Sequence, residues 1–308
     1  MALHRLASIT VGVPDPGPTM SYYRDFGLQP EADGWFSTVD GGRQLRIVSS
    51  ARRRLVEVEI AVDDADDLGR VRTALRERIG VDVEQGEDHV AAVEPVTGVR
   101  AVARVLSRIV QPSIPVPPYN APGAVARGTS RAPAIGREEP VRPRKLGHVV
   151  IGSVDQPTSE RFFVEGFGLK VSDVVPGMAA FLRCSSDHHN VLVTHAPVNF
   201  LHHSSWQVED IDEIGRGATR MIEDHPERHV WGLGRHHIGS NFFWYLKDPA
   251  GNFSEYYSDL DCIVDEALWK PEVWDAAHSL YSWGPPPPPS FIEPEDLAAL
   301  MTGVHQPR

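Results

Sequence analysis

Two stretches, LASITVGVPD at residues 6–15 and LGHVVIGSVD at residues 146–155, decide the fold, because one reads as a copy of the other. Both are apolar and β-branched and both close on an acidic residue after a turn, as a strand does. Each leads into a helical stretch that ends near Gly-Leu, PTMSYYRDFGL in the first half and PTSERFFVEGFGL in the second. The chain therefore contains an internal repeat.

The match between the halves continues along the chain. VDDADDLGR at 62–70 pairs with VEDIDEIGR at 208–216, and EPVTG at 94–98 resembles DPAG at 248–251. Each copy divides again into two units, each a strand and a helix followed by further strands. We therefore predict an α+β protein with two tandem domains, each a pair of βαβββ modules that form a curved mixed sheet.

A proline-rich stretch divides the predicted domains. We expect a first domain over residues 1–110, a second over 144–263, and a tail over 264–308 that packs on the second domain. Residues 111–143 hold eight prolines and few large apolar side chains, which predicts an irregular linker. Five consecutive prolines in the tail, at 285–289, favour a polyproline II strap.

Composition excludes several classes of function. The formal net charge of −12 argues against nucleic acid or an anionic membrane as partner. No apolar run approaches the roughly 18 residues of a membrane span, and the first residues do not read as a signal peptide. Two cysteines, Cys184 and Cys262, cannot build a disulfide scaffold or a CxxC zinc site. We expect a cytoplasmic protein.

Comparing the copies also points to a metal site. Three residues with metal-binding side chains in the second copy align with residues of a different type in the first. The pairs are His148 with Ser8, His203 with Glu57, and Glu255 with Val102. If the modules pack as halves of a cup, two imidazoles and one carboxylate converge inside it. That set leaves coordination positions open and is typical of non-haem Fe(II) oxygenases. We predict one mononuclear site in the second domain, with Fe(II) or alternatively Mn(II), and a first domain without metal.

The stretch GRHHIGSNFFWYLKDPAGNFSEYY at 234–257 resembles the signature of the type I extradiol ring-cleavage dioxygenases, members of the vicinal-oxygen-chelate superfamily. The matching positions are Gly234, His236, Tyr245, Asp248, Pro249, Gly251 and Glu255. Two positions depart: Trp244 replaces an aliphatic residue or Phe, and His237 replaces a common glycine. The resemblance covers roughly residues 1–263.

The resemblance implies the same metal ligands, His148, His203 and Glu255. Aligning VVIGSVD with SSWQVED selects His203 over its neighbour without help from the family. His202 then either points to the opposite face or supports a ligand from behind by hydrogen bonding.

Three further residues receive roles from the resemblance. His189 resembles the acid–base histidine of the family, and His188 remains the competing candidate. His236 and Tyr245 are expected to hydrogen-bond the oxygens of the substrate.

The implied reaction is extradiol cleavage of a substituted catechol by O2, which gives a muconic semialdehyde-type product in aromatic catabolism. The partners would be a small aromatic diol, O2 and further copies of the chain, as a tetramer or larger. The alternatives are a glyoxalase-like lyase or isomerase, a hydroxyphenylpyruvate-type dioxygenase, and a non-catalytic aromatic-ligand binding protein. The ring substituents of the substrate cannot be read from the sequence.

Overall fold

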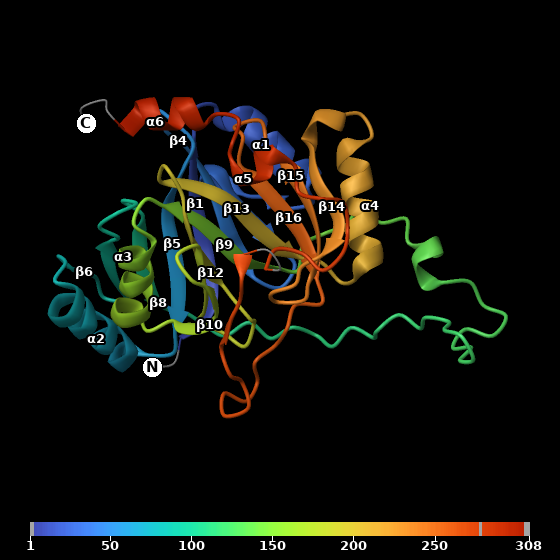
Figure 1. Cartoon of the computed structure of the whole chain (residues 1–308), viewed down its shortest axis with the longest axis horizontal. Helices are drawn as coiled ribbons and strands as arrows, with labels where there is room; N and C mark the ends of the chain where they lie inside the picture. Colours follow the sequence, from blue (N-terminus) through green and yellow to red (C-terminus); the bar gives the residue numbers. More distant parts are fainter. Residues whose placement is uncertain (1–2, 277–278, 305–308) are drawn as a thin grey trace.

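The computed structural model describes residues 3–276 and 279–304, and two mixed sheets form its body (Figure 1). The first sheet has eight strands in the order β2-β3-β4-β1-β5-β8-β7-β6. The second has nine in the order β14-β15-β16-β13-β9-β12-β11-β10-β17. Apart from β17, the two orders are equivalent, which confirms the prediction of two tandem α+β halves.

The first half contains two successive βαβββ modules. The first module consists of β1 (Leu3–Val13), α1 (Pro16–Asp25), β2 (Gln29–Pro30), β3 (Trp35–Thr38) and β4 (Gly42–Ser49). The second consists of β5 (Arg54–Val62), α2 (Ala65–Ala74), β6 (Glu84–Gln85), β7 (His89–Val93) and β8 (Arg100–Val105). The antiparallel pair β1 and β5 joins the modules at the centre of the sheet.

The second half repeats this plan. Its first module consists of β9 (Lys145–Ser153), α3 (Gln156–Arg161), β10 (Lys170–Val175), β11 (Ala179–Arg183) and β12 (Val191–His195). Its second consists of β13 (Phe200–Gln207), α4 (Ile211–Ile222), β14 (His229–Arg235), β15 (Phe242–Lys247) and β16 (Phe253–Ser258). The tail adds β17 (Glu272–Val273), α5 (Pro289–Ile292) and α6 (Leu297–Val304).

Short turns of other helix types complete the described elements. The 3-10 turns are η1 (Ala32–Gly34), η3 (Pro133–Gly136) and η5 (Pro226–Arg228), and the π-helical turns are η2 (Leu75–Ile79) and η4 (Phe162–Phe167). Among the described residues, no helix is long and apolar enough to cross a membrane.

The acidic residue that ends each repeated strand motif begins the next helix. The side chains of Asp15, Asp64, Asp155 and Asp210 each accept a hydrogen bond from a backbone N–H in the first turn of the helix that follows. Such an N-cap satisfies a donor that the helix itself leaves unpaired, and it contributes about 1 kcal/mol. The acidic turns of the sequence therefore fix where α1, α2, α3 and α4 start.

The two sheets share one register around their centres. Ser205 on β13 is paired with His148 on β9 and with Glu255 on β16. The residues of the first sheet at the same three places are Glu59, Ser8 and Val102. The positions that the sequence comparison matched are therefore also equivalent in the pairing of the strands.

The halves pack on each other through α1 and β16. The rings of Phe26 and Tyr256 stack with centroids 3.9 Å apart, and the Tyr22 hydroxyl is hydrogen-bonded to that of Ser254 at 2.5 Å. Because side chains alternate along a strand, Glu255 points to the opposite face of the sheet from Ser254 and Tyr256. Packing of the first half behind β16 therefore holds Glu255 toward the interior of the second sheet.

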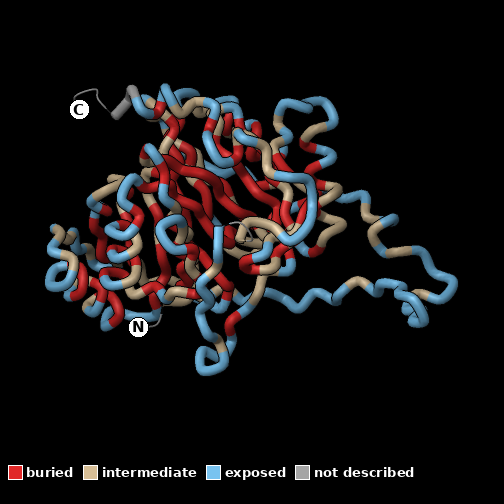
Figure 2. The backbone as a smooth tube through the Cα atoms, viewed as in Figure 1, coloured by how far each residue is buried: buried red, intermediate tan, exposed pale blue. Residues whose placement is uncertain are grey.

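Two irregular segments leave the body. Residues 106–144 form no strand or α-helix, and their middle part projects far from both sheets (Figure 1). We call residues 112–136 the arm; most of it is exposed (Figure 2). The tail instead returns to the second sheet, where β17 pairs in parallel with the edge strand β10.

Candidate metal centre

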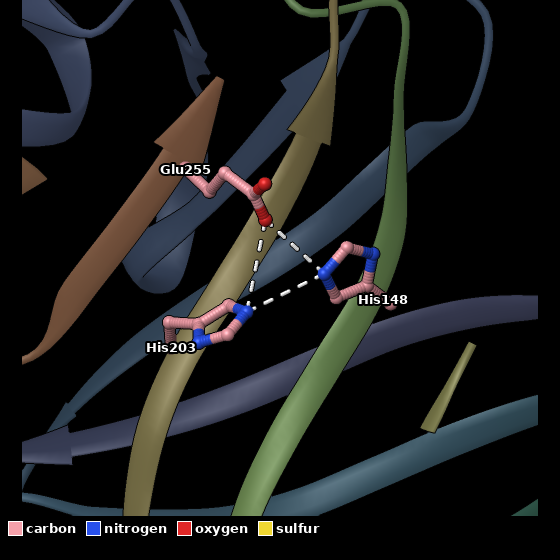
Figure 3. A group of neighbouring side chains, drawn as sticks. All are labelled: His148, His203 and Glu255. Carbon is pink, nitrogen blue, oxygen red and sulfur yellow. Dashed lines mark hydrogen bonds and ion pairs between the residues drawn. The ribbon is translucent and has the colours of Figure 1, made fainter. Parts of the chain in front are cut away.

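Three neighbouring strands of the second sheet bring His148, His203 and Glu255 together (Figure 3). The Nε2 atoms of the two histidines are 3.4 Å apart. Oε2 of Glu255 lies 3.1 Å from Nε2 of His148 and 3.7 Å from that of His203. All three side chains are buried. They come from β9, β13 and β16, so the pairing of these strands sets the geometry of the cluster.

The Glu255 carboxylate is held rigidly. Ser205 donates a hydrogen bond to its Oε2 at 2.5 Å, and the Asn241 amide donates to its Oε1 at 3.0 Å. Burial alone would raise the pKa of Glu255, but the adjacent imidazoles of His148 and His236 hold it well below the usual value. The group is therefore a fixed carboxylate anion at the floor of the site.

The orientation of His203 is fixed by its neighbour. Nε2 of His202 lies 2.8 Å from the carbonyl oxygen of Phe291, which can only accept. Burial lowers the pKa of His202 to about 4, so its ring is neutral and its Nδ1 is an acceptor. Nδ1 of His203, 2.8 Å away, must then carry the donated proton. Nε2 of His203 is left with a free lone pair that faces His148 and Glu255.

The donor set fits a metal ion. Two Nε2 atoms and one carboxylate oxygen converge within 4.8 Å of one another. Two imidazole nitrogens and a carboxylate on one face of a cation leave its other positions open. His148, His203 and Glu255 are the residues that would hold it.

His188 and His189 point in different directions. His188 is completely buried and its Nε2 is 3.1 Å from the Asp173 carboxylate. The ring of His189 lies 4.2 Å from that of His148 and lines the cavity above the cluster. Nδ1 of His188 lies 3.1 Å from Nδ1 of His189. In both histidine pairs, 188–189 and 202–203, the first ring thus orients the second through a contact between their Nδ1 atoms.

His236 and Tyr245 form a hydrogen-bonded pair beside Glu255. The Tyr245 hydroxyl is 2.8 Å from Nε2 of His236, whose Nδ1 donates to the carbonyl of Leu280 at 2.6 Å. Nε2 of His236 is 3.6 Å from Oε1 of Glu255. Burial raises the pKa of Tyr245 well above its ordinary value, and the nearby Glu255 adds to the shift, so the phenol keeps its proton.

A cavity of about 310 Å³ opens over the cluster. Its polar lining includes the five residues already described, His148, His189, His203, His236 and Tyr245. Thr194, His195, His202, Ser279 and Glu293 line it as well. Its walls are mainly apolar and come from strands β9 to β13 and from the tail. They include Val150, Phe181, Leu192, Phe200, Leu280 and Phe291. No lysine or arginine lines it among the described residues.

Sequence reasoning missed four groups that support the site. Ser205 and Asn241 anchor the carboxylate, and the carbonyls of Leu280 and Phe291 orient two histidines. Ser205 could have been found, because it follows His203 by two positions and so shares its face of β13. The tail carbonyls gave no signal, since a backbone oxygen leaves no mark in the sequence.

The profile of the Glyoxalase/Bleomycin resistance protein/Dioxygenase superfamily matches residues 145–256. The matched residues, which make up most of the second half, belong to that superfamily. The predicted superfamily membership is confirmed, and the three clustered residues all lie inside the matched range.

Comparisons with individual proteins add to the match with the superfamily profile. Metapyrocatechase 2 of Cupriavidus necator is 36% identical over 154 residues, which are 49% of this chain and 48% of that protein. The chain thus matches only about half the length of this curated relative. The structure of BphC, a halotolerant catechol dioxygenase, aligns over 95% of this chain and 97% of its own with a TM-score of 0.73 at 16% identity.

A second solved structure has the same fold with a different name. The Mn(II)-bound glyoxalase from Novosphingobium aromaticivorans covers 93% of this chain and 95% of its own, with a TM-score of 0.71 at 23% identity. At these identities the two structures support the fold alone. Together they show that both halves of the chain, and not only the half inside the superfamily profile, share the fold of these two structures.

Proposed function

We propose that the protein is an extradiol dioxygenase that opens the ring of a catechol with O2. The observation that carries the proposal is the cluster of His148, His203 and Glu255 at the floor of an apolar cavity. The likeness of about half of the chain to metapyrocatechase 2 supports the same reaction class. Catechol plus O2 equals the muconic semialdehyde-type product in atoms and electrons, so no further reductant is required.

We propose Fe(II) as the metal, with Mn(II) as the alternative, since this ligand set accepts both. When bound, the metal supplies open positions at which two adjacent catechol oxygens and O2 meet. The protein fixes two of its three proposed ligands before the metal arrives. Ser205 and Asn241 hold the carboxylate, and His202 holds His203 with Nε2 facing inward.

The remaining polar groups handle protons. We assign to the His236 and Tyr245 pair the binding of a catechol oxygen, because their hydrogen bond brings two polar atoms to the cavity beside Glu255. We assign the acid–base role to His189 rather than His188. His189 faces the cavity, whereas His188 is buried behind it against Asp173. His188 is proposed to position His189, and His202 to position His203.

The cavity suggests the substrate class. At about 310 Å³ it lies at the small end of ligand pockets, which span roughly 300–1,000 Å³. Its apolar walls suit an unsubstituted or alkyl-substituted single ring. No lysine or arginine is among its described lining residues, whereas the acidic Glu293 is, so a catechol that carries a carboxylate would find no permanent cation to pair with there. We therefore propose catechol and small alkyl catechols over dihydroxyphenylacetate or dihydroxybenzoate.

The test loads the protein anaerobically with Fe(II), adds each catechol and then admits air. The expected result is a yellow product with one O2 consumed per catechol and no added reductant. A parallel preparation with Mn(II) decides the metal. No oxygen uptake with any of catechol, 4-methylcatechol or 2,3-dihydroxybiphenyl would contradict the proposal and favour a lyase, an isomerase or a binding protein.

A glyoxalase-like lyase or isomerase is the second candidate, supported by the structural likeness to the Mn(II)-bound glyoxalase. Such a reaction consumes no O2, so the oxygen measurement separates the two. The three-residue cluster favours the dioxygenase, because an open face must accommodate two substrates at once.

We also propose that the reaction takes place in the cytoplasm. Cys184 and Cys262 are both free thiols, which suits a reducing compartment. Cell fractionation with an antibody against the protein would test this.

A further inference from the structure

The arm leaves and re-enters the body at nearly the same place. On one side, Gln111 is hydrogen-bonded to Gln207 at 3.0 Å. On the other, Arg137 forms an ion pair with Asp210 at 2.8 Å. Gln207 and Asp210 are three residues apart, a span of roughly 10 Å even when fully extended. The 25 residues of the arm are therefore not needed to connect the two halves of the chain.

Among the described residues, the arm forms no hydrogen bond or ion pair with either sheet, although its Tyr119 lies near Asp212 and Asp210 at the start of α4, which add to the rise that burial causes in the pKa of its phenol. Within the described part of the chain, the hydrogen bonds of residues 112–136 join residues of the arm to one another or to Arg137 at its end. Examples are the bridge between Ala121 and Ala124 and the bond from Arg127 to Asn120. Figures 1 and 2 show the arm extending away from both sheets with an exposed surface. Its conformation is thus not set by the two sheets.

Exposed apolar side chains concentrate on this segment. Of the sixteen large apolar side chains that are exposed among the described residues, five lie in the arm, and Val110 lies just before it. The five are Ile114, Val116, Tyr119, Val125 and Ile135. Val116 is 84% exposed and Val125 is 72% exposed. Single exposed apolar residues are ordinary, but such a concentration marks an interaction surface.

The charge of the arm is opposite to that of the body. The arm contains Arg127 and Arg131 and no acidic residue, so the rest of the chain carries a formal charge of −14 when the whole carries −12. Two such bodies repel each other across most of their surfaces. A basic, apolar arm is the part of one copy that another acidic copy attracts.

The arm is also stiffened in advance. It holds six of the chain's prolines, at 112, 115, 117, 118, 122 and 133. Proline fixes φ and favours the extended polyproline II conformation, so less conformational entropy is lost when the arm becomes fixed on a partner.

We propose that the arm is an assembly element, which packs on the body of a second copy of this chain. Its length suits the role, because a stable interface uses about 20–30 residues a side. In a closed dimer the contact is reciprocal, so the arm of each copy packs on the body of the other. The proposal does not depend on the reaction assigned to the metal centre.

The test measures molar mass by light scattering after size exclusion, at micromolar concentrations. The native chain is expected at 68 kDa or a higher multiple of its 34.0 kDa. Replacing residues 112–136 by a Gly-Ser linker of about eight residues, long enough for the gap, should lower the mass at least twofold. Circular dichroism and retained metal would show that the protomer still folds.

A milder variant keeps the proposal falsifiable if the linker variant misfolds. The substitutions Arg127→Glu and Arg131→Glu should weaken assembly at least tenfold. The matched control, Arg76→Glu with Arg78→Glu, makes the same charge change at exposed positions of η2 and should not weaken it. A native chain of 34.0 kDa, an unchanged mass without the arm, or equal weakening in the control would overturn the proposal.

Discussion

At the scale of single residues, the site depends on which nitrogen of each histidine carries the proton. In both doublets, 188–189 and 202–203, the first ring binds an acceptor behind it and the second ring faces the cavity. The proposed metal ligand His203 and the acid–base candidate His189 are therefore oriented in the same way, each by a hydrogen bond with the preceding histidine. A histidine can serve in this way because a neutral ring offers one donor and one acceptor at fixed positions.

Removing a metal ligand should be distinguishable from removing the proposed acid–base residue. We expect His148→Ala to lose most of its bound metal, since only two ligands remain. His189→Ala should keep its metal but lose turnover by about 10²–10⁴-fold. Metal analysis together with steady-state rates checks both. A His189→Ala protein with full activity would show that the role belongs elsewhere, His188 first.

The doublet at 202–203 gives a prediction on metal affinity. His202→Leu removes the acceptor for Nδ1 of His203, so that the ligand can rotate or change tautomer. We expect a loss of metal affinity of about 10–100-fold. His202→Gln offers both a donor and an acceptor and should retain more of it. Dialysis of loaded protein against graded chelator measures the affinity. Equal retention by native and Leu proteins would rule out the positioning role.

Much of this could be predicted from residues alone. Repeat comparison matched His148, His203 and Glu255 to Ser8, Glu57 and Val102, because strand register repeats with the sequence. The functions assigned to His189, His236 and Tyr245 remain predictions. What could not be predicted lies in contacts between distant segments: the amide of Asn241 on Glu255 and the tail carbonyls on two histidines.

At the scale of elements, the turn between β15 and β16 contains a buried carboxyl group whose protonation affects stability. Asp248 is buried, and burial raises its pKa from 3.8 to about 6 despite hydrogen bonds from Asn252 and Ala250. Because the folded pKa exceeds the unfolded one, this group favours folding below pH 4. As the pH rises toward 6, this contribution to the unfolding free energy, roughly 3 kcal/mol, is lost.

The variant Asp248→Asn cannot ionise and removes this dependence. We expect the difference in unfolding free energy between native and variant proteins to shift by roughly 2–3 kcal/mol in favour of the variant between pH 4 and pH 7. Urea unfolding at both pH values measures it. A difference that does not change with pH would mean that Asp248 is not titrating in this range.

At the scale of the whole molecule, Arg53 ties three regions together. It lies in the first half, forms a bidentate ion pair with Asp296 of the tail at 2.6 and 2.7 Å, and donates to the Leu201 carbonyl of β13 at 3.0 Å. Its side chain is only 3% exposed. The first half therefore reaches the metal centre indirectly, by holding both the tail and the strand that bears His203.

Removing this tie should loosen the tail more than the body. We expect Arg53→Met to cost roughly 1–3 kcal/mol of unfolding free energy, since two acceptors lose a charged donor. Cleavage by protease should become faster near the tail. The control Arg108→Met removes an exposed pair with Asp63 and should cost less than about 0.5 kcal/mol. Equal cleavage rates in native, Arg53→Met and control proteins would contradict the coupling.

The two tail carbonyls have a consequence for how the protein is made. His148, His203 and Glu255 all leave the ribosome before Leu280 and Phe291, whose oxygens orient His236 and His202. A nascent chain can therefore pair its strands and gather its three ligands while two of the rings around them are still free to turn. A metal bound at that stage would meet a looser set of donors, so we expect the site to reach its full selectivity only once the later segment has been synthesised and has docked.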